Sequence, residues 1–315
     1  MIEVVGLNKH YGQVRAVEDL SFTVKPGIVT GFLGPNGAGK STTMRCIVGL
    51  DNPSSGHTTI GGQPYRALKK PLTRVGTLLD AKATHPNRTA GNHLKWIAQA
   101  NGLPTKRVDE VLALVGLTDV AGKKTGGFSL GMGQRLGLAA ALLGDPEYLI
   151  LDEPVNGLDP EGIHWVRTLL KNLADEGRTV LISSHLLSEM ALTADHLVVI
   201  GRGKLVADTP IQDFIREHSA TTVMVRTAHP EAFQSALREQ GISFDTKLID
   251  TDPSPTFIIT NHTTDEIGTL AFSRGIGLLE LSEHRASLEQ AFLQTTGDTV
   301  QYQASTPEQS AQEEK

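Results

Sequence analysis

The sequence predicts an α/β protein with a mostly parallel sheet, an antiparallel β subdomain, a helical insert and a small C-terminal α+β domain. Two nearly continuous apolar runs, YLIL at 148–151 and TVLISS at 179–184, are typical of buried strands. Residues 89–116 and 129–144 instead carry the apolar spacing of helices. Strands of this kind that alternate with helices indicate a parallel sheet. The stretch from about 82 to 146 is expected to be the helical insert.

The residues before this core favour antiparallel strands. Within residues 1–32, the apolar side chains of Leu20, Phe22 and Val24 alternate as in a half-buried strand. Residues 28–33 form an apolar run that leads into a glycine-rich loop, and a helix is expected after it. Residues 51–62, DNPSSGHTTIGG, are expected to form turns.

After about residue 215 the pattern changes, and we expect a second domain over 216–297 beside a first domain over 1–215. Its predicted elements follow the order β-α-β-β-α-β, which is that of a split βαβ domain. The polar residues 298–315 are expected to be a disordered tail.

Composition narrows the possible partners. The 315 residues include 29 Lys and Arg against 35 Asp and Glu, a net charge of −6, so no nucleic acid partner is expected. A single cysteine, Cys46, rules out a disulfide within the chain. No run approaches the roughly 18 apolar residues of a spanning helix. If the protein works at a membrane, another chain is expected to cross it.

The glycine-rich loop predicts a nucleotide site. GPNGAGKS, from Gly34 to Ser41, fits the pattern G-x-x-x-x-G-K-S/T between a strand and a helix, where backbone N–H groups turn inward onto phosphates. Lys40 is expected to reach the β and γ phosphates, and the Ser41 hydroxyl to ligate Mg²⁺. The residues expected to bind nucleotide here are Gly34, Pro35, Asn36, Gly37, Ala38, Gly39, Lys40, Ser41 and Thr42. The loop alone leaves kinases, GTPases and ATPases open.

A second motif favours hydrolysis. In LILDEP an apolar strand ends in Asp152 and Glu153. An acid at a strand end can hold Mg²⁺ through its water shell, which is the role expected of Asp152. Glu153 is then placed to accept a proton from the attacking water as general base.

A third motif is FSLGMGQRLGLAAALL, which begins at Phe128. Ser129 is expected to cap a helix, and Gly131 to let backbone N–H groups approach an anion closely. In this position the motif resembles the signature sequence of the nucleotide-binding subunits of ATP-binding cassette (ABC) transporters. The resemblance covers about residues 1–215 and implies that this helix end binds the γ-phosphate held by the opposite subunit.

Further residues match the family's motifs in the expected order. NGLDP resembles the D-loop, with Asp159 as its acid, and SSHLLSE places His185 at the family's switch histidine. Tyr11 resembles the aromatic that stacks on adenine; the alternative is an edge aromatic of the core. RVGTLLD gives Asp80 where the family's Q-loop has Gln or Glu, which implies a metal and catalytic role or else a plain surface acid. Leu130 and Met132 also depart from the common signature.

The resemblance implies an ATPase subunit that binds ATP and Mg²⁺, closes as a head-to-tail homodimer and drives a separate multi-spanning permease. Its expected location is the cytoplasmic face of the cell membrane. The signature stretch, VGTLLD and the ending LEQAFL resemble most the subfamily that drives bacterial drug and antibiotic (bacitracin-type) efflux. The alternatives are a soluble ABC-type ATPase that remodels a protein or nucleic acid complex, and a nucleotide-gated module with little turnover.

Overall fold

The computed structural model describes residues 1–80, 83–184, 187–218, 222–249, 252–284 and 292. Contacts within the chain divide it into a unit that holds Met1–Ile211 and a second unit that begins at Gln212. In the part of the chain that is described, no helix has the length and apolar character needed to cross a membrane. The predicted tail, 298–315, lies outside the described residues.

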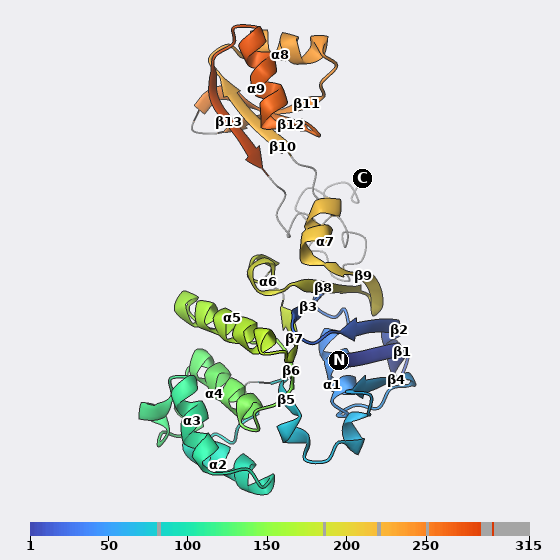
Figure 1. Ribbon diagram of the computed structural model, residues 1–315, viewed down its shortest axis with the longest axis vertical. Coiled ribbons are helices and arrows are strands. Elements are labelled where there is room, and N and C mark those ends of the chain that lie inside the picture. Colours follow the sequence, from blue (N-terminus) through green and yellow to red (C-terminus); the bar gives the residue numbers. More distant parts are fainter. Residues whose placement is uncertain (81–82, 185–186, 219–221, 250–251, 285–291, 293–315) are drawn as a thin grey trace, which may run out of the picture. The chain divides into compact units, whose positions relative to one another are not determined.

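A six-stranded sheet forms the centre of the first unit (Figure 1). Its neighbouring strands pair in parallel except for the last, β9, which is antiparallel. Every residue of β3, β6 and β7 is buried, which confirms the prediction from their apolar runs. The strand order is β5 (Val75–Leu78), β6 (Tyr148–Leu151), β7 (Thr179–Ser184), β3 (Val29–Leu33), β8 (His196–Gly201) and β9 (Lys204–Pro210).

Both faces of this sheet are covered. Helix α1 (Lys40–Ile47) packs Met44 and Ile47 into a core shared with the antiparallel strands. On the other face lie α5 (Pro160–Asp175) and α6 (Leu187–Thr193) (Figure 1). The parallel strands therefore end between covered faces, and the loops at their carboxyl ends are the natural place for a site.

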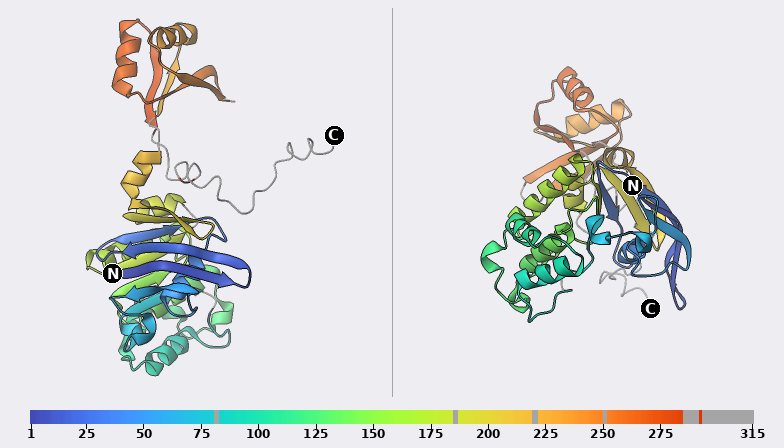
Figure 2. Two further views of the ribbon diagram at one scale, coloured as in Figure 1. Left: turned by 90° about the vertical axis from the view of Figure 1, so that its right-hand side faces the viewer. Right: turned by 60° about the horizontal axis from the view of Figure 1, so that its bottom comes forward.

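The antiparallel sheet has the order β2 (Val14–Val24), β1 (Ile2–Tyr11) and β4 (Ser55–Ile60). Figure 2 shows the blue strands of this sheet side by side across the first unit. The prediction that 51–62 forms only turns is wrong for β4. Thr58 and Ile60 alternate toward the core, and pairing with β1 outweighs the turn-forming residues that precede the strand.

The helical insert lies between β5 and β6, as predicted. It contains α2 (Ala90–Ala100), α3 (Lys106–Leu114) and α4 (Leu130–Leu142). The expected continuous helix over 89–116 is interrupted, because the chain turns after α2 and Pro104 cannot continue a helix.

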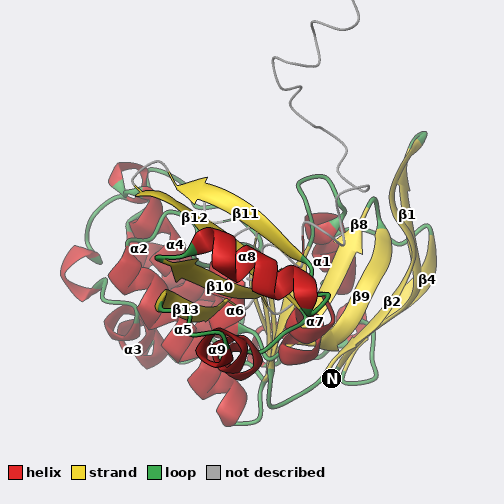
Figure 3. Ribbon diagram, turned by 90° about the horizontal axis from the view of Figure 1, so that it is seen from above, coloured by secondary structure: helices red, strands yellow, loops and turns green. Residues whose placement is uncertain are grey.

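The second unit confirms the order β-α-β-β-α-β. Its antiparallel sheet follows the order β11 (Phe244–Ile249), β12 (Asp252–Thr260), β10 (Thr222–Thr227) and β13 (Leu278–His284). Helices α8 (Pro230–Glu239) and α9 (Thr264–Ser273) pack on one face of it (Figure 3). The short helix α7 (Ile211–His218) precedes β10. The rings of Phe233 and Phe257 meet in this core at a centroid distance of 5.1 Å.

Candidate active site

The phosphate-binding loop connects β3 to α1 in a conformation that depends on glycine. Gly39 has φ +103°, and a Cβ atom there would lie 2.4 Å from the carbonyl oxygen of Ala16. The loop borders a cavity of about 280 Å³. The residues that line this phosphate-loop cavity are Ala16, Asn36, Gly37, Gly39, Lys40, Ser41, Thr42, Asp152 and Glu153.

Lys40 brings a positive charge into this loop. Its side chain is only 7% exposed, and its Nζ donates to the carbonyl oxygens of Gly34 at 2.6 Å and Pro35 at 3.3 Å. Burial lowers the pKa of Lys40, and the nearby carboxylates of Glu153 and Asp152 partly oppose that shift. A partly desolvated ammonium that borders this cavity is suited to binding an anionic phosphate. Ala38, a residue of the same loop, is buried.

Asp152 is held from two sides by hydroxyl groups. Ser41 Oγ donates to Asp152 Oδ2 at 2.6 Å, and Ser183 Oγ, at the end of β7, donates to Oδ1. Hydroxyl and carboxylate oxygens are hard donors of the kind that Mg²⁺ prefers. Asp80, just after β5, lines a neighbouring cavity of about 690 Å³ together with Ser41 and Asp152.

Glu153 lies in the phosphate-loop cavity with an unusual backbone. Its φ is +51°, in the left-handed region that non-glycine residues rarely adopt. Its N–H donates to Ser183 Oγ at 3.0 Å, and its carbonyl oxygen accepts from Gln134 Nε2 at 2.7 Å. Sequence reasoning missed both partners. The polar end of an otherwise apolar strand was a usable signal for Ser183, whereas no spacing pointed to Gln134.

Tyr11 lies beside this cavity and is 46% exposed. Its hydroxyl donates to Asp51 Oδ2 at 2.8 Å, and Lys9 Nζ lies 4.8 Å from the centre of its ring. Partial burial and the Asp51 carboxylate raise the pKa of Tyr11, and the hydroxyl of Thr42 opposes that shift. The ring therefore stands near the first turn of α1 but does not line the phosphate-loop cavity.

The signature stretch opens α4 in the way its residues predict. Ser129 is the N-cap, and its Oγ accepts from the Met132 N–H at 3.2 Å. Gly131 packs closely on the loop between β6 and α5. A Cβ atom at Gly131 would lie 2.9 Å from the Gly157 carbonyl oxygen of that loop. Ser129 and Leu130, which is 48% exposed, line a separate cavity of about 380 Å³.

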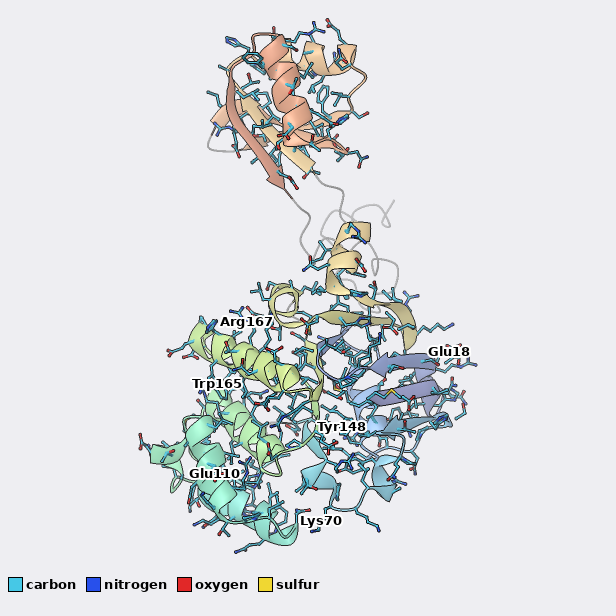
Figure 4. The ribbon with its side chains drawn as sticks, viewed as in Figure 1. Glu18, Lys70, Glu110, Tyr148, Trp165 and Arg167 are labelled. Atoms are coloured by element: carbon cyan, nitrogen blue, oxygen red, sulfur yellow. The ribbon has the colours of Figure 1, made fainter. Side chains whose placement is uncertain are left out.

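The same helix is joined to α5. The Arg135 guanidinium lies 5.1 Å from the centre of the Trp165 ring, and Figure 4 labels Trp165 on α5. Asp159 is the N-cap of α5, with Oδ1 accepting from the Gly162 N–H at 2.9 Å. The structure thus gives the Asp159 carboxylate a capping contact, and this residue does not line the phosphate-loop cavity.

Eight of the predicted residues come together in one chain around the phosphate-loop cavity: Asn36, Gly37, Gly39, Lys40, Ser41, Thr42, Asp152 and Glu153. Ser129, Gly131 and Asp159 do not join them. His185 lies outside the described residues. A phosphate loop and a carboxylate pair at the end of a parallel sheet define a nucleotide-hydrolysing site.

Comparison with known proteins identifies the family. The profile described as "ABC transporter" matches residues 17–156, and one described as "AAA domain, putative AbiEii toxin, Type IV TA system" matches 125–191. A domain of unknown function matches 221–289, in the second unit. A solved structure titled "Structure of ATP binding subunit of ABC transporter" aligns with a TM-score of 0.63 and 29% identity, over 69% of this chain and 92% of that one.

Two curated relatives extend over almost the whole chain. The bacitracin transport ATP-binding protein of Bacillus licheniformis is 38% identical over 94% of this chain and 97% of its own length. The linearmycin resistance ATP-binding protein of Bacillus subtilis (strain 168) is 33% identical over 95% and 99%. The chain belongs to the ATP-binding subunits of ABC transporters, and it binds and hydrolyses ATP. Subunits of this family dimerise and work with a membrane permease.

Proposed function

We propose that two copies of this subunit close head to tail around two ATP molecules. Each ATP would contact the phosphate loop, Asp152, Glu153 and His185 of one copy, and Ser129 and Gly131 of the other. The observation that carries this proposal is the separation of the two regions within one chain. The phosphate-loop cavity and the cavity at the signature helix have no lining residue in common. A second copy would bring the helix end and its backbone N–H groups to the γ-phosphate.

Mg²⁺ fits the donors that the chain offers beside the phosphates. Ser41 Oγ and Asp152 Oδ2 lie 2.6 Å apart, close enough for both oxygens to bind one cation. When bound, Mg²⁺ neutralises phosphate charge. Asp80 lines the adjoining cavity with both residues, and we assign it a supporting role in metal binding and catalysis. Tyr11 would stack on the base, and Asp159 would support the nucleotide site from the signature side.

Glu153 would act as the general base. Its position in the same cavity as Lys40 and Ser41 places a carboxylate beside the expected γ-phosphate. A carboxylate accepts the proton of the attacking water, and a carboxamide cannot.

The partner would be a separate multi-spanning permease, and this subunit would bind to it at the cytoplasmic face of the membrane. Trp96, 55% exposed, and Leu50, 59% exposed, line the cavity of about 690 Å³ that also contains Asp80. Exposed apolar side chains around a cavity that reaches the metal site would let a docked segment sense the nucleotide. The names of the bacitracin and linearmycin relatives favour export of antibiotics.

The test uses Glu153→Gln, which should bind ATP, lose hydrolysis and accumulate as a dimer. Size-exclusion chromatography with and without ATP and Mg²⁺ measures the dimer, and phosphate release measures turnover. Wild-type turnover in this variant would contradict the assignment of the base. The trapped protein would then be used to recover partners from detergent-solubilised host membranes. Recovery of one multi-spanning protein supports the permease, whereas recovery of soluble partners alone would contradict it.

A further inference from the structure

The backbone of Glu153 is strained, and contacts from other parts of the chain must hold it in this conformation. Its φ of +51° lies in the left-handed region, and Pro154 follows it directly. The proline ring disfavours helical conformations of the preceding residue, so neither local preference supports the observed backbone. Such strain persists only where surrounding contacts fix the conformation.

Two side chains from other elements form hydrogen bonds with the main chain of Glu153. On its amino side, Ser183 Oγ accepts from the Glu153 N–H and also donates to Asp152. On its carbonyl side, Gln134 Nε2 donates to the Glu153 oxygen at 2.7 Å. The Asn156 N–H donates to the same oxygen at 3.1 Å, within the local turn. Gln134 therefore gives this carbonyl group a long-range contact.

Gln134 is unusual for its position. It is 3% exposed on α4, where a buried carboxamide loses solvent and must find partners. It lies on the helix whose first turn carries Ser129 and Gly131. The hydrogen bond therefore runs from the signature helix to the main chain of the expected base.

We infer that Gln134 is a positioning residue that holds Glu153 in its catalytic orientation and ties it to the signature helix. This inference rests on the proposed role of Glu153 as base. Gln134 itself does not line the phosphate-loop cavity, so its loss should act on turnover and leave ATP binding nearly unchanged.

The test is Gln134→Met in the full chain, because methionine has a similar length and no donor. We expect kcat to fall between about 10-fold and 100-fold, the cost of a displaced catalytic group, with little change in KM for ATP. Gln99→Met is the matched control, since Gln99 is exposed on α2 in the same insert. Its kcat should equal that of the wild type. Wild-type kcat in Gln134→Met would overturn the inference.

A double-mutant cycle distinguishes positioning from general destabilisation. In the Glu153→Gln background, Gln134→Met should cause no further loss of the residual hydrolysis, because it acts through Glu153. Equal fold-losses in both backgrounds would overturn the inference. Wild-type hydrolysis in Glu153→Gln alone would instead refute the proposed base, whatever Gln134 does.

A second variant covers the case in which Gln134→Met does not fold. Gln134→Glu keeps the length of the side chain, but its carboxylate cannot donate to the Glu153 carbonyl oxygen unless it is protonated. Its kcat relative to wild type should therefore rise as the pH is lowered. A ratio that does not depend on pH would contradict the donor role of Gln134.

Discussion

The two units of this protein differ in what they bury. The first unit buries Lys40, Gln134 and Ser183, all at or beside the ends of its parallel strands. In the described part of the second unit, the buried polar side chains are those of Thr227 and Thr256, around a core of aliphatic and phenylalanine residues. Buried polar groups are costly unless they are paired or used. The comparison teaches that the chemistry is concentrated in the first unit, whereas the core of the second is built for folding.

Substitution of Lys40 should have the largest effect on the nucleotide site of the first unit. Lys40→Ala removes the buried ammonium of the phosphate loop, and ATP affinity should fall by about 100-fold, which corresponds to the upper end of the free energy of a hydrogen bond to a charged group, about 3 kcal/mol. Isothermal titration calorimetry with ATP measures it. Lys171→Ala, at an exposed lysine of α5, is the control and should bind normally. Near-normal affinity of Lys40→Ala would mean that the site lies elsewhere.

A core substitution in the second unit should lower the stability of that unit and leave ATP binding unchanged. Phe257→Ala removes a ring that is 1% exposed, and the unfolding free energy of this unit should fall by about 3–5 kcal/mol. Denaturant unfolding followed by circular dichroism measures the loss. ATP affinity should remain that of the wild type. A parallel loss of ATP binding would show that the second unit supports the nucleotide site.

Features that depend on a few consecutive residues could be predicted from the sequence, whereas features that depend on long-range contacts could not. GPNGAGKS and LILDEP carry their conformation and chemistry within a few consecutive residues, so the loop and the carboxylate pair were predictable from spacing. The strand β4 was not, because its pairing with β1 is a long-range contact that local turn residues conceal. The contact of Gln134 with Glu153 joins residues 19 apart across two elements, and no periodicity reports it.

Asp159 offers a smaller test within the first unit. Asp159→Ala removes the cap of α5, which should cost about 1 kcal/mol of stability. Thermal denaturation should detect this loss, and Asp159→Asn should restore stability. Turnover should stay below that of the wild type in both variants, because Asp159 is proposed to support the nucleotide site as well. Normal turnover in both variants would contradict that role.

The smallest effect is expected for removal of residues 298–315, which are polar and poor in large apolar side chains. ATP hydrolysis and the melting temperature should stay nearly unchanged. A large decrease in either would contradict the prediction that this segment is a disordered tail.

The central claim is that each ATP site needs two copies of the chain, and mixing two defective chains tests it most directly. Both would carry Glu153→Gln and different affinity tags; one would add Lys40→Ala and the other Ser129→Glu. Each chain alone should remain monomeric with ATP and Mg²⁺, because one lacks the phosphate contact and the other places a negative charge at the signature helix. The mixture retains one intact composite site, so ATP should allow each tag to recover the other chain. Failure of the mixed pair to form, while Glu153→Gln alone dimerises, would contradict the head-to-tail account.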